Sequence, residues 1–407
     1  MRIPVRHAAL AVALAALAVP TAAPALDRDR DRTLRVATFN ASLNRNAEGQ
    51  LIGDLSTPAN AQAGAVAEVI QRVRPDVLLV NEFDFDEART AARLFGANYL
   101  SVGRNGAAPI HYRYRYSAPS NTGIPSGFDL NNNGTVGGPE DAFGFGFFTG
   151  QFGMQVYSRY PIAERFVRTF QHFRWKDMPG ARLPDNPATP APGDFYSPEE
   201  LNVVRLSSKS HWDIPVIVDD EVVHVLASHP TPPVFDGPED RNGLRNADEI
   251  RFWADYIGPR RRSAYIYDDQ GRRGGLRRAS FVIAGDQNSD PLDGDSVPGA
   301  IQQLLDHPRV DASFTPRSAG AVEASALQGG ANLTHRSDPA FDTADFQDIP
   351  GPGNLRADYV LPSRRSLEIE GGFVFWPPGS DPLSRLTGTF PFPASDHRLV
   401  ALDLEVK

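Results

Sequence analysis

A chain of 407 residues with 41% hydrophobic and 22% charged residues has the composition of a folded, soluble protein, which excludes wholesale disorder. Its net charge of −9 excludes a protein that grips long polyanions by overall charge, so a phosphate-rich substrate would need local cations or bound metal. The absence of cysteine excludes disulfides and thiolate zinc sites.

The N-terminal segment has the three parts of a secretory signal peptide. Arg2 and Arg6 precede an apolar run at residues 8–19, and Ala23-Pro24-Ala25 offers a cleavage site. The alternative is a short membrane anchor, although the run is short for a bilayer. We expect a signal peptide at residues 1–25, a flexible leader at residues 26–33, and a secreted mature protein, extracellular or periplasmic, without stable membrane insertion.

Strand-like and helical segments then alternate through the first half of the chain. The short apolar run at residues 77–80 is of interest because it delivers Asn81 and Glu82 at its end. A long loop rich in Gly, Asn, Pro and Ser is expected near residues 117–150. Around it, hydrophobic periodicity predicts strands at residues 34–39, 77–80 and 154–158 and helices at residues 59–74 and 86–95.

The second half continues the mixed pattern, and no Pro/Gly linker divides two cores. We therefore expect one α/β domain over residues 34–407, with functional loops at one end of its sheets. A further loop is expected at residues 177–198. The pattern predicts strands at residues 216–218, 222–227, 281–284, 358–361 and 399–406 and helices at residues 239–257 and 297–305.

The strongest local signal is Gly285-Asp286-Gln287-Asn288, directly after a buried strand. Asp286 and Asn288 stand two residues apart, and in an extended segment such side chains point to the same side. A carboxylate can orient and deprotonate a water, and an amide can donate to a developing oxyanion. The alternative interpretation is an ordinary turn.

Four other positions carry side chains suited to the same chemistry. Asp396-His397 precedes the last strand and suits metal binding with proton transfer, or else surface decoration. Glu82 is a hard oxygen ligand of the kind Mg²⁺ prefers, or else a loop carboxylate. His229 follows a strand, and Asp358 opens one, where it can orient a histidine.

Seven short segments, in this order, resemble the endonuclease/exonuclease/phosphatase superfamily of deoxyribonucleases, apurinic endonucleases, neutral sphingomyelinases and inositol phosphatases. They span nearly the whole chain after the leader. The resemblance implies a four-layered α/β sandwich, with two packed mixed β-sheets flanked by helices. The segments are Val36-Ala-Thr-Phe-Asn40, Val80-Asn-Glu82, Val156-Tyr-Ser-Arg-Tyr-Pro161, Ala227-Ser-His229, Gly285-Asp-Gln-Asn288, Ala357-Asp358-Tyr359 and Ser395-Asp-His397.

The resemblance also implies roles for these residues. Glu82 is expected to bind Mg²⁺, or Mn²⁺ in its place, with Asn40 beside it and Asp396 as a further ligand. Asp286 corresponds to the residue that activates the attacking water, and Asn288 to a phosphate contact. His397, oriented by Asp358, corresponds to the histidine on the scissile phosphate. His229 corresponds to the histidine of the deoxyribonuclease-like branch that helps protonate the leaving group.

A second metal site is predicted from a separate motif. The segment from Asp129 to Glu140 fits the twelve-residue calcium loop D-x-[DN]-x-[DN]-G-x₅-E. The segment before it is not helical, so we expect an isolated calcium loop that orders residues 117–150. The alternative is an Asn/Gly loop without metal. The predicted Ca²⁺ ligands are Asp129, Asn131, Asn133, Thr135 and Glu140.

Cations near tryptophans or on the helix after His229 are candidate substrate contacts: Lys176, Lys209, His211 and Arg245. The leading interpretation is a secreted, monomeric, metal-dependent phosphodiesterase or nuclease, with nucleic acid among its candidate substrates. One alternative is a phosphatase or phospholipase C-like hydrolase acting on a phospholipid or a sugar phosphate. A second is a non-catalytic calcium-binding protein on the same scaffold.

Overall fold

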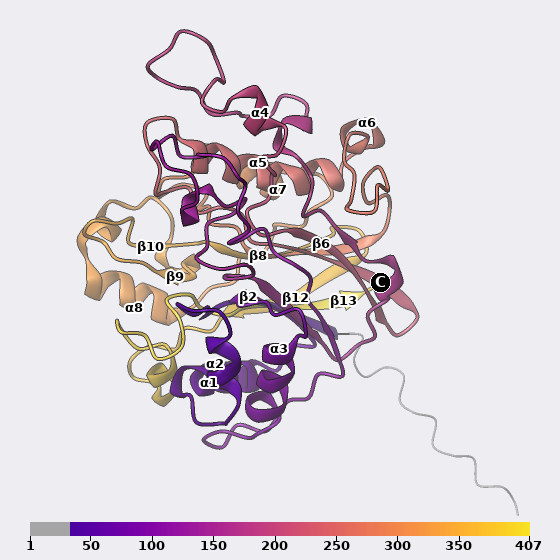
Figure 1. Ribbon diagram of the computed structural model, residues 1–407. Coiled ribbons are helices and arrows are strands. Elements are labelled where there is room, and N and C mark those ends of the chain that lie inside the picture. Colours follow the sequence, from indigo (N-terminus) through magenta and orange to yellow (C-terminus); the bar gives the residue numbers. More distant parts are fainter. Residues whose placement is uncertain (1–32) are drawn as a thin grey trace, which may run out of the picture. The chain divides into compact units, whose positions relative to one another are not determined.

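Two β-sheets packed face to face form the centre of the protein in the computed structural model, which describes residues 33–407 (Figure 1). The expected signal peptide and residues 26–32 of the leader lie outside the described residues, so both stay predictions. Thr33, assigned to the leader from sequence, is the first residue of a strand.

The first sheet consists of six strands, which are β1 (Thr33–Leu43), β2 (Val77–Phe83), β3 (Tyr114–Tyr116), β4 (Met154–Ser158), β12 (Leu367–Val374) and β13 (Val400–Val406). Their order is β12-β13-β1-β2-β4-β3. The central pair, β1 and β2, is parallel, and the other pairs are antiparallel. In the parallel pair Asn40 is level with Asn81, so the polar ends of β1 and β2 lie side by side.

The second sheet consists of five strands, which are β5 (Arg168–Thr169), β6 (His211–Val218), β7 (Glu221–Ser228), β8 (Ser280–Asp286) and β11 (Asp358–Pro362). Their order is β11-β8-β7-β6-β5, with β7 and β8 parallel. Asp358 pairs with Asp286, which fixes these two carboxylates at the same end of the sheet. A separate two-stranded ribbon pairs β9 (Ala344–Asp345) with β10 (Asn354–Leu355).

The strands β2, β4, β8 and β11 are buried on both faces, which explains their largely apolar sequences. Along β1, Leu34 and Val36 point into the core between the sheets, where they meet Val225 and Val282 of the second sheet. Ala37 instead joins the core under the first layer of helices. Each fully buried valine or leucine of this kind contributes about 1.5–3 kcal/mol to folding.

Helices cover the outer faces of both sheets, so the predicted four-layered α/β sandwich is confirmed (Figure 1). Cores beneath them connect α1, α2 and α3 to the first sheet, and α5 and α7 to the second. No helix within residues 33–407 is long and apolar enough to cross a membrane. The α-helices of the described residues are α1 (Gln50–Leu55), α2 (Ala61–Val73), α3 (Thr90–Phe95), α4 (Pro198–Leu201), α5 (Arg241–Tyr256), α6 (Arg260–Ser263), α7 (Gln302–Leu305) and α8 (Ala319–Gln328).

Local capping explains where the helices depart from the predicted bounds. The predicted helix at residues 86–95 begins only at Thr90, because the Asp86 carboxylate accepts the amide hydrogens of Thr90 and Ala91. The predicted helix at residues 297–305 is wrong in its first half, since α7 starts at Gln302. The segment 117–150 is a loop as predicted, but not wholly on the surface: Asn121 is buried, and its amide donates to the carbonyls of Gln171 and Ser207.

Candidate active site

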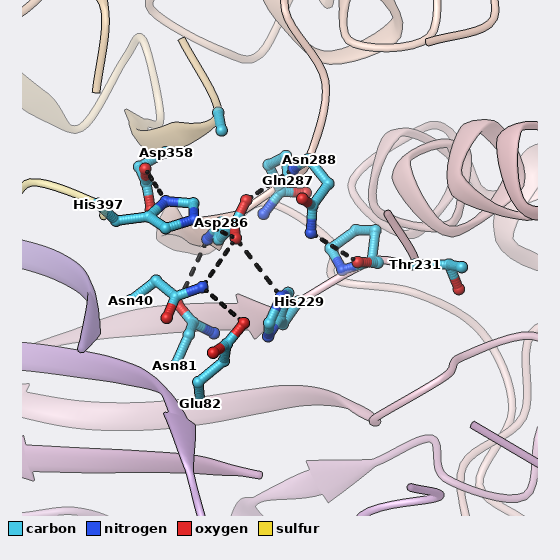
Figure 2. A network of polar contacts seen from close by, with 12 residues as sticks. Asn40, Asn81, Glu82, His229, Thr231, Asp286, Gln287, Asn288, Asp358 and His397 are labelled. Atoms are coloured by element: carbon cyan, nitrogen blue, oxygen red, sulfur yellow. Dashed lines mark hydrogen bonds and ion pairs between the residues drawn. The ribbon is translucent and has the colours of Figure 1, made fainter. Parts of the chain in front are cut away.

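The ends of strands from both sheets meet at one point of the molecule, and the polar residues predicted from sequence gather there (Figure 2). The first sheet supplies Asn40 and Glu82, and the second supplies Asp286 and Asp358. Histidines come from segments that follow or precede strands: His229 directly after β7 and His397 shortly before β13. Residues more than 350 positions apart in the sequence therefore form one cluster.

Asp286 is at the centre of the cluster. Its Oδ2 accepts a hydrogen bond from Asn40 Nδ2 at 3.1 Å and lies 3.4 Å from His229 Nε2 and 3.6 Å from His397 Nε2. Its Oδ1 accepts the backbone amide of Asn288 at 2.8 Å. One carboxylate thus faces two imidazoles, which is an arrangement suited to proton transfer.

Three residues of the cluster have unusual backbone angles, and these angles set the directions of the catalytic side chains. Gly285 has φ 146°, and a Cβ there would lie 1.9 Å from the carbonyl oxygen of Ser228, so only glycine lets β7 and β8 approach this closely. Glu82 and Asn288 adopt left-handed φ values of 56° and 49°, which cost about 1–3 kcal/mol each for non-glycine residues. Such outliers concentrate where geometry serves function.

His397 is held by Asp358, as the sequence predicted. Its Nδ1 donates to Asp358 Oδ2 at 2.8 Å, and the hydroxyl of Thr343 donates to the same oxygen at 2.8 Å. The ring of Phe346 packs edge-on against the imidazole, with centroids 5.2 Å apart. Thr343 was not foreseen, because nothing in its local sequence marks it as the partner of an aspartate fifteen residues away.

The surroundings separate the protonation states of the three central groups. Burial raises the pKa of Asp286 to about 7. Burial alone would lower the pKa of His397, but the carboxylates of Asp358 and Asp286 outweigh it and hold that pKa well above its usual value. Burial, assisted by the charges of Lys209 and His397, holds the pKa of His229 well below its usual value. One histidine is therefore a cation and the other neutral.

Glu82 and Asp396 form the part of the site best suited to a metal ion. Burial and the neighbouring charge of Asp396 raise the pKa of Glu82, so the two carboxylates repel each other and would gain from a cation between them. Asn40 Nδ2 donates to Glu82 Oε1 at 3.1 Å, and Ser42 Oγ donates to Asp396 Oδ1 at 3.1 Å. This set of oxygen donors fits a hard divalent ion.

A second group of possible ligand atoms lies beside the first. Single atoms of Asp286, Asp358 and His397 lie within 4.8 Å of one another, and all three residues are buried. The short bond between His397 Nδ1 and Asp358 already pairs two of these residues, however. The oxygen donors of Glu82 and Asp396 are therefore the better match to Mg²⁺ chemistry.

The cluster opens into a cavity of about 720 Å³ whose floor and walls differ in origin. Strand ends and the segment before β13 supply the floor, which includes Glu82, Asp286 and His397. Loops at residues 232–235, 345–352 and 390–394 supply the walls, which are rich in proline and phenylalanine. Among the described residues that line this cavity there is no lysine or arginine.

Lys209 is the one predicted substrate contact that the structure brings to the cluster. It is buried, and its ammonium lies within electrostatic reach of Glu82, Asp286 and His229. Burial lowers the pKa of Lys209, while the carboxylates of Glu249 and Glu82 oppose that change.

The structure does not bring the other three predicted substrate contacts to the cluster. Lys176 is exposed and donates to the side chain of Asn202. The ring of His211 bonds the backbone carbonyl of Glu249 inside an aromatic core, and burial lowers the pKa of His211 to about 4. The guanidinium of Arg245 donates hydrogen bonds to backbone carbonyls, including that of Leu206 at 2.8 Å.

The predicted calcium loop lies outside the cluster and forms a tight turn. Both carboxylate oxygens of Asp129 accept backbone amides, from Asn133 at 3.0 Å and from Gly134 at 2.7 Å. The amide oxygens of Asn131 and Asn133 accept further amides at 3.1 and 2.8 Å. The remaining predicted ligands, Thr135 and Glu140, are exposed. This winding leaves each side-chain oxygen a free lone pair, but calcium binding there stays a prediction.

Comparison with known proteins places the chain in a family. A profile described as Endonuclease/Exonuclease/phosphatase family matches residues 37–397. No curated protein matches the chain in sequence.

Solved structures resemble the chain at low identity. An endonuclease/exonuclease/phosphatase from Beutenbergia cavernae is 18% identical over 92% of this chain and 72% of its own, with a TM-score of 0.49. A family protein from Leptotrichia buccalis is 13% identical over 92% and 99% (TM-score 0.44). Sphingomyelinase C from Streptomyces griseocarneus is 15% identical over 91% and 99% (TM-score 0.43). Similarity at such low sequence identity does not indicate which substrate the chain acts on.

The family assignment rests on the profile, which extends over most of the chain and includes every residue of the cluster in Figure 2. The family predicted from seven short segments is thereby confirmed. The chain belongs to the endonuclease/exonuclease/phosphatase family of metal-dependent phosphoester hydrolases.

Proposed function

We propose that this protein is a secreted, monomeric phosphodiesterase that uses a divalent metal, Mg²⁺ or Mn²⁺, and a water activated at Asp286. The observation that carries the proposal is the position of Asp286 between a cationic and a neutral histidine, with its own pKa raised to about 7. A base whose pKa lies near the working pH is the most effective proton acceptor.

The reaction balances with groups that the cluster contains. The water oxygen bonds to phosphorus, its proton passes to Asp286, and the phosphorus–oxygen ester bond breaks. The departing oxygen takes a proton from a histidine. His397 is held as a cation and has a proton to give, whereas the resemblance assigns this step to His229, which is neutral here. Asn288, which lines the cavity, provides a donor to the phosphate oxygens, and the buried Lys209 adds positive charge near Glu82 and Asp286.

A divalent ion held by Glu82 and Asp396, with Asn40 beside them, would neutralise charge on the phosphate. The residues themselves set its position, since Asn40 bonds both Glu82 and Asp286 and so links the metal ligands to the base. Asp358 and Thr343 keep the imidazole of His397 in one tautomer and one orientation.

Hydrolysis of bis(p-nitrophenyl) phosphate with Mg²⁺, with and without EDTA, tests the proposed function. We expect Lys209→Gln to lower the rate, and Lys176→Gln, which changes a cation outside the cavity, to leave it unchanged. Absence of turnover with both Mg²⁺ and Mn²⁺ would refute the proposal and favour a non-catalytic calcium-binding protein.

The choice between the two histidines is tested by varying the leaving group. p-Nitrophenolate departs without a proton, whereas an alkyl alcohol needs one. We expect His397→Gln to slow the alkyl diester more than the nitrophenyl diester, and His229→Gln to slow both alike. The reverse pattern would assign the proton donor to His229.

We also propose that Ca²⁺ binds the loop at Asp129, Asn131, Asn133, Thr135 and Glu140. Two carboxylates give weak affinity, in the range of extracellular calcium modules. Excess Ca²⁺ should raise the melting temperature of the wild type in the presence of Mg²⁺, but not that of Asp129→Asn. An equal rise in both proteins would count against this site.

A further inference from the structure

The walls of the active-site cavity point to a substrate class. We propose that the phosphodiester is a phospholipid with an uncharged or zwitterionic head group, whose hydrocarbon part lies in an apolar cleft that borders the cavity. The inference rests on the proposed phosphodiesterase activity and adds what the reacting phosphate is attached to.

The cavity has enough positive charge nearby for a single phosphate group. Its lining has no lysine or arginine but contains the acids Asp295 and Asp345 on its walls, besides the carboxylates of the floor. The buried Lys209 supplies one cation beside Asp286 and Glu82. A nucleic-acid strand carries a charge at every nucleotide and is normally held by a series of lysines and arginines. These walls would repel it.

The rim of the cavity is apolar and exposed. Phe235 is 88% exposed, Phe390 is 75% exposed, and Ile349, next to the lining residue Pro350, is 80% exposed. These residues come from three separate loops, which all border the same opening. Large apolar side chains gathered at one site on a soluble protein mark an interaction surface.

A second cleft of about 720 Å³ lies beside the cavity and is lined in part by α8. Its apolar lining includes Leu327 and Trp376, and Leu327 is 78% exposed. Its only cation among the described lining residues is Arg385, which is ion-paired with Glu68. The two clefts share one wall, formed by Asp345, Phe346, Gln347, Phe390 and Phe392.

A neighbouring apolar cleft favours a long hydrocarbon chain over a short apolar group. A phosphate on the floor near His397 would place its ester substituent against the phenylalanine wall, and a long substituent would continue into the cleft beside Leu327. The chain carries −9 overall, so a surface of zwitterionic lipid suits it better than an anionic one. Contact through exposed side chains needs no membrane-spanning helix.

Two measurements on the full chain test the inference, with vesicles of phosphatidylcholine or sphingomyelin as the lipid. The first is cosedimentation in EDTA, which does not depend on turnover. The second is the ratio of lipid hydrolysis to bis(p-nitrophenyl) phosphate hydrolysis with Mg²⁺. The test variant is Leu327→Gln, and the matched control is Phe166→Gln, which removes a 60% exposed apolar residue. Phe166 lies near the Val216 end of β6, opposite the cluster.

We expect binding and hydrolysis of the zwitterionic vesicles by the wild type and by Phe166→Gln, with weaker binding to anionic vesicles. Leu327→Gln should lower both the bound fraction and the hydrolysis ratio at least about tenfold, with an unchanged melting temperature. Hydrolysis of DNA or RNA without lipid would overturn the inference and assign a nuclease. Turnover of the small diester alone would also overturn it but leave the proposed function standing. No turnover of any substrate would refute both.

Discussion

Replacing Asp358 by asparagine should disable His397 while leaving the shape of the site intact. The carboxylate lies 2.8 Å from His397 Nδ1 and is buried. At that distance two unit charges attract each other by about 6 kcal/mol when the effective dielectric constant is about 20. The hydrogen bond that an amide can still form offsets part of this, which leaves about 3–5 kcal/mol, or about 10²–10⁴ in kcat.

The pH dependence of the same variant should change in a defined direction. Asp358 is the largest contribution that raises the pKa of His397 against burial. Without it the imidazole loses its proton at lower pH, so the alkaline limb of the activity profile should move to lower pH. The assay is kcat for an alkyl phosphodiester, whose leaving group needs a proton, at saturating Mg²⁺ across a pH series.

Asp213→Asn provides the matched control, because Asp213 is also buried and bonds a histidine, His224, at 2.5 Å, but does not line the cavity. It should lower stability by about 1–3 kcal/mol without lowering kcat. A kcat for Asp358→Asn within about threefold of the wild type, or an equal loss in both variants, would refute the role assigned to Asp358.

Three further predictions address the metal, the acid–base balance and the backbone. Glu82→Gln should raise the Mg²⁺ concentration for half-maximal activity by at least about tenfold in a metal titration, and an unchanged value would exclude Glu82 as a ligand. Burial raises the pKa of Asp342 to about 8, so the folded state keeps a proton that the unfolded chain loses near pH 4, and stability should fall between about pH 4 and pH 8. Urea unfolding should show a steeper fall in the wild type than in Asp342→Asn, because the raised pKa of Asp286 still contributes part of the slope in the variant. Gly285→Ala should lower the free energy of unfolding by about 3 kcal/mol or more, because its Cβ would clash with the Ser228 carbonyl. Gly271→Ala, with φ 78° and no neighbour within 4 Å, should lower it by about 1 kcal/mol. Equal losses in the two variants would show that the positive φ, and not the clash, sets the effect.

Much of the fold could be predicted because most elements have clear local signals. The strand β4 matches its predicted bounds, since Gly153 precedes it and the segment Arg159-Tyr160-Pro161 follows it. The helix α2 follows from its periodicity and from Asn60, whose side chain caps it. The helix α8 was not predicted, because its small residues give little periodicity. The strand β12 was hidden by the pair Gly371-Gly372.

The cluster could be predicted because its residues follow or open strands, and strand ends of packed sheets meet. The same reasoning could not exclude Arg245 or His211, because a sequence does not show that a guanidinium or an imidazole is already satisfied by backbone carbonyls. Thr343 was missed for the related reason that it lies in a loop, fifteen residues before its partner Asp358 on β11. The residues of the cavity walls were not predicted, because loops rich in proline and phenylalanine have no periodic pattern.

The separate origin of floor and walls has a consequence for how such an enzyme can change. The groups that break the phosphoester bond are anchored in strands, whereas the groups that face the rest of the substrate are carried by loops such as residues 232–235 and 345–352. Loops tolerate insertion and replacement far better than buried strands. Evolution can therefore change the substrate specificity without changing the catalytic residues. A graft of these loops onto a relative should transfer the substrate specificity, while the recipient keeps its own catalytic residues.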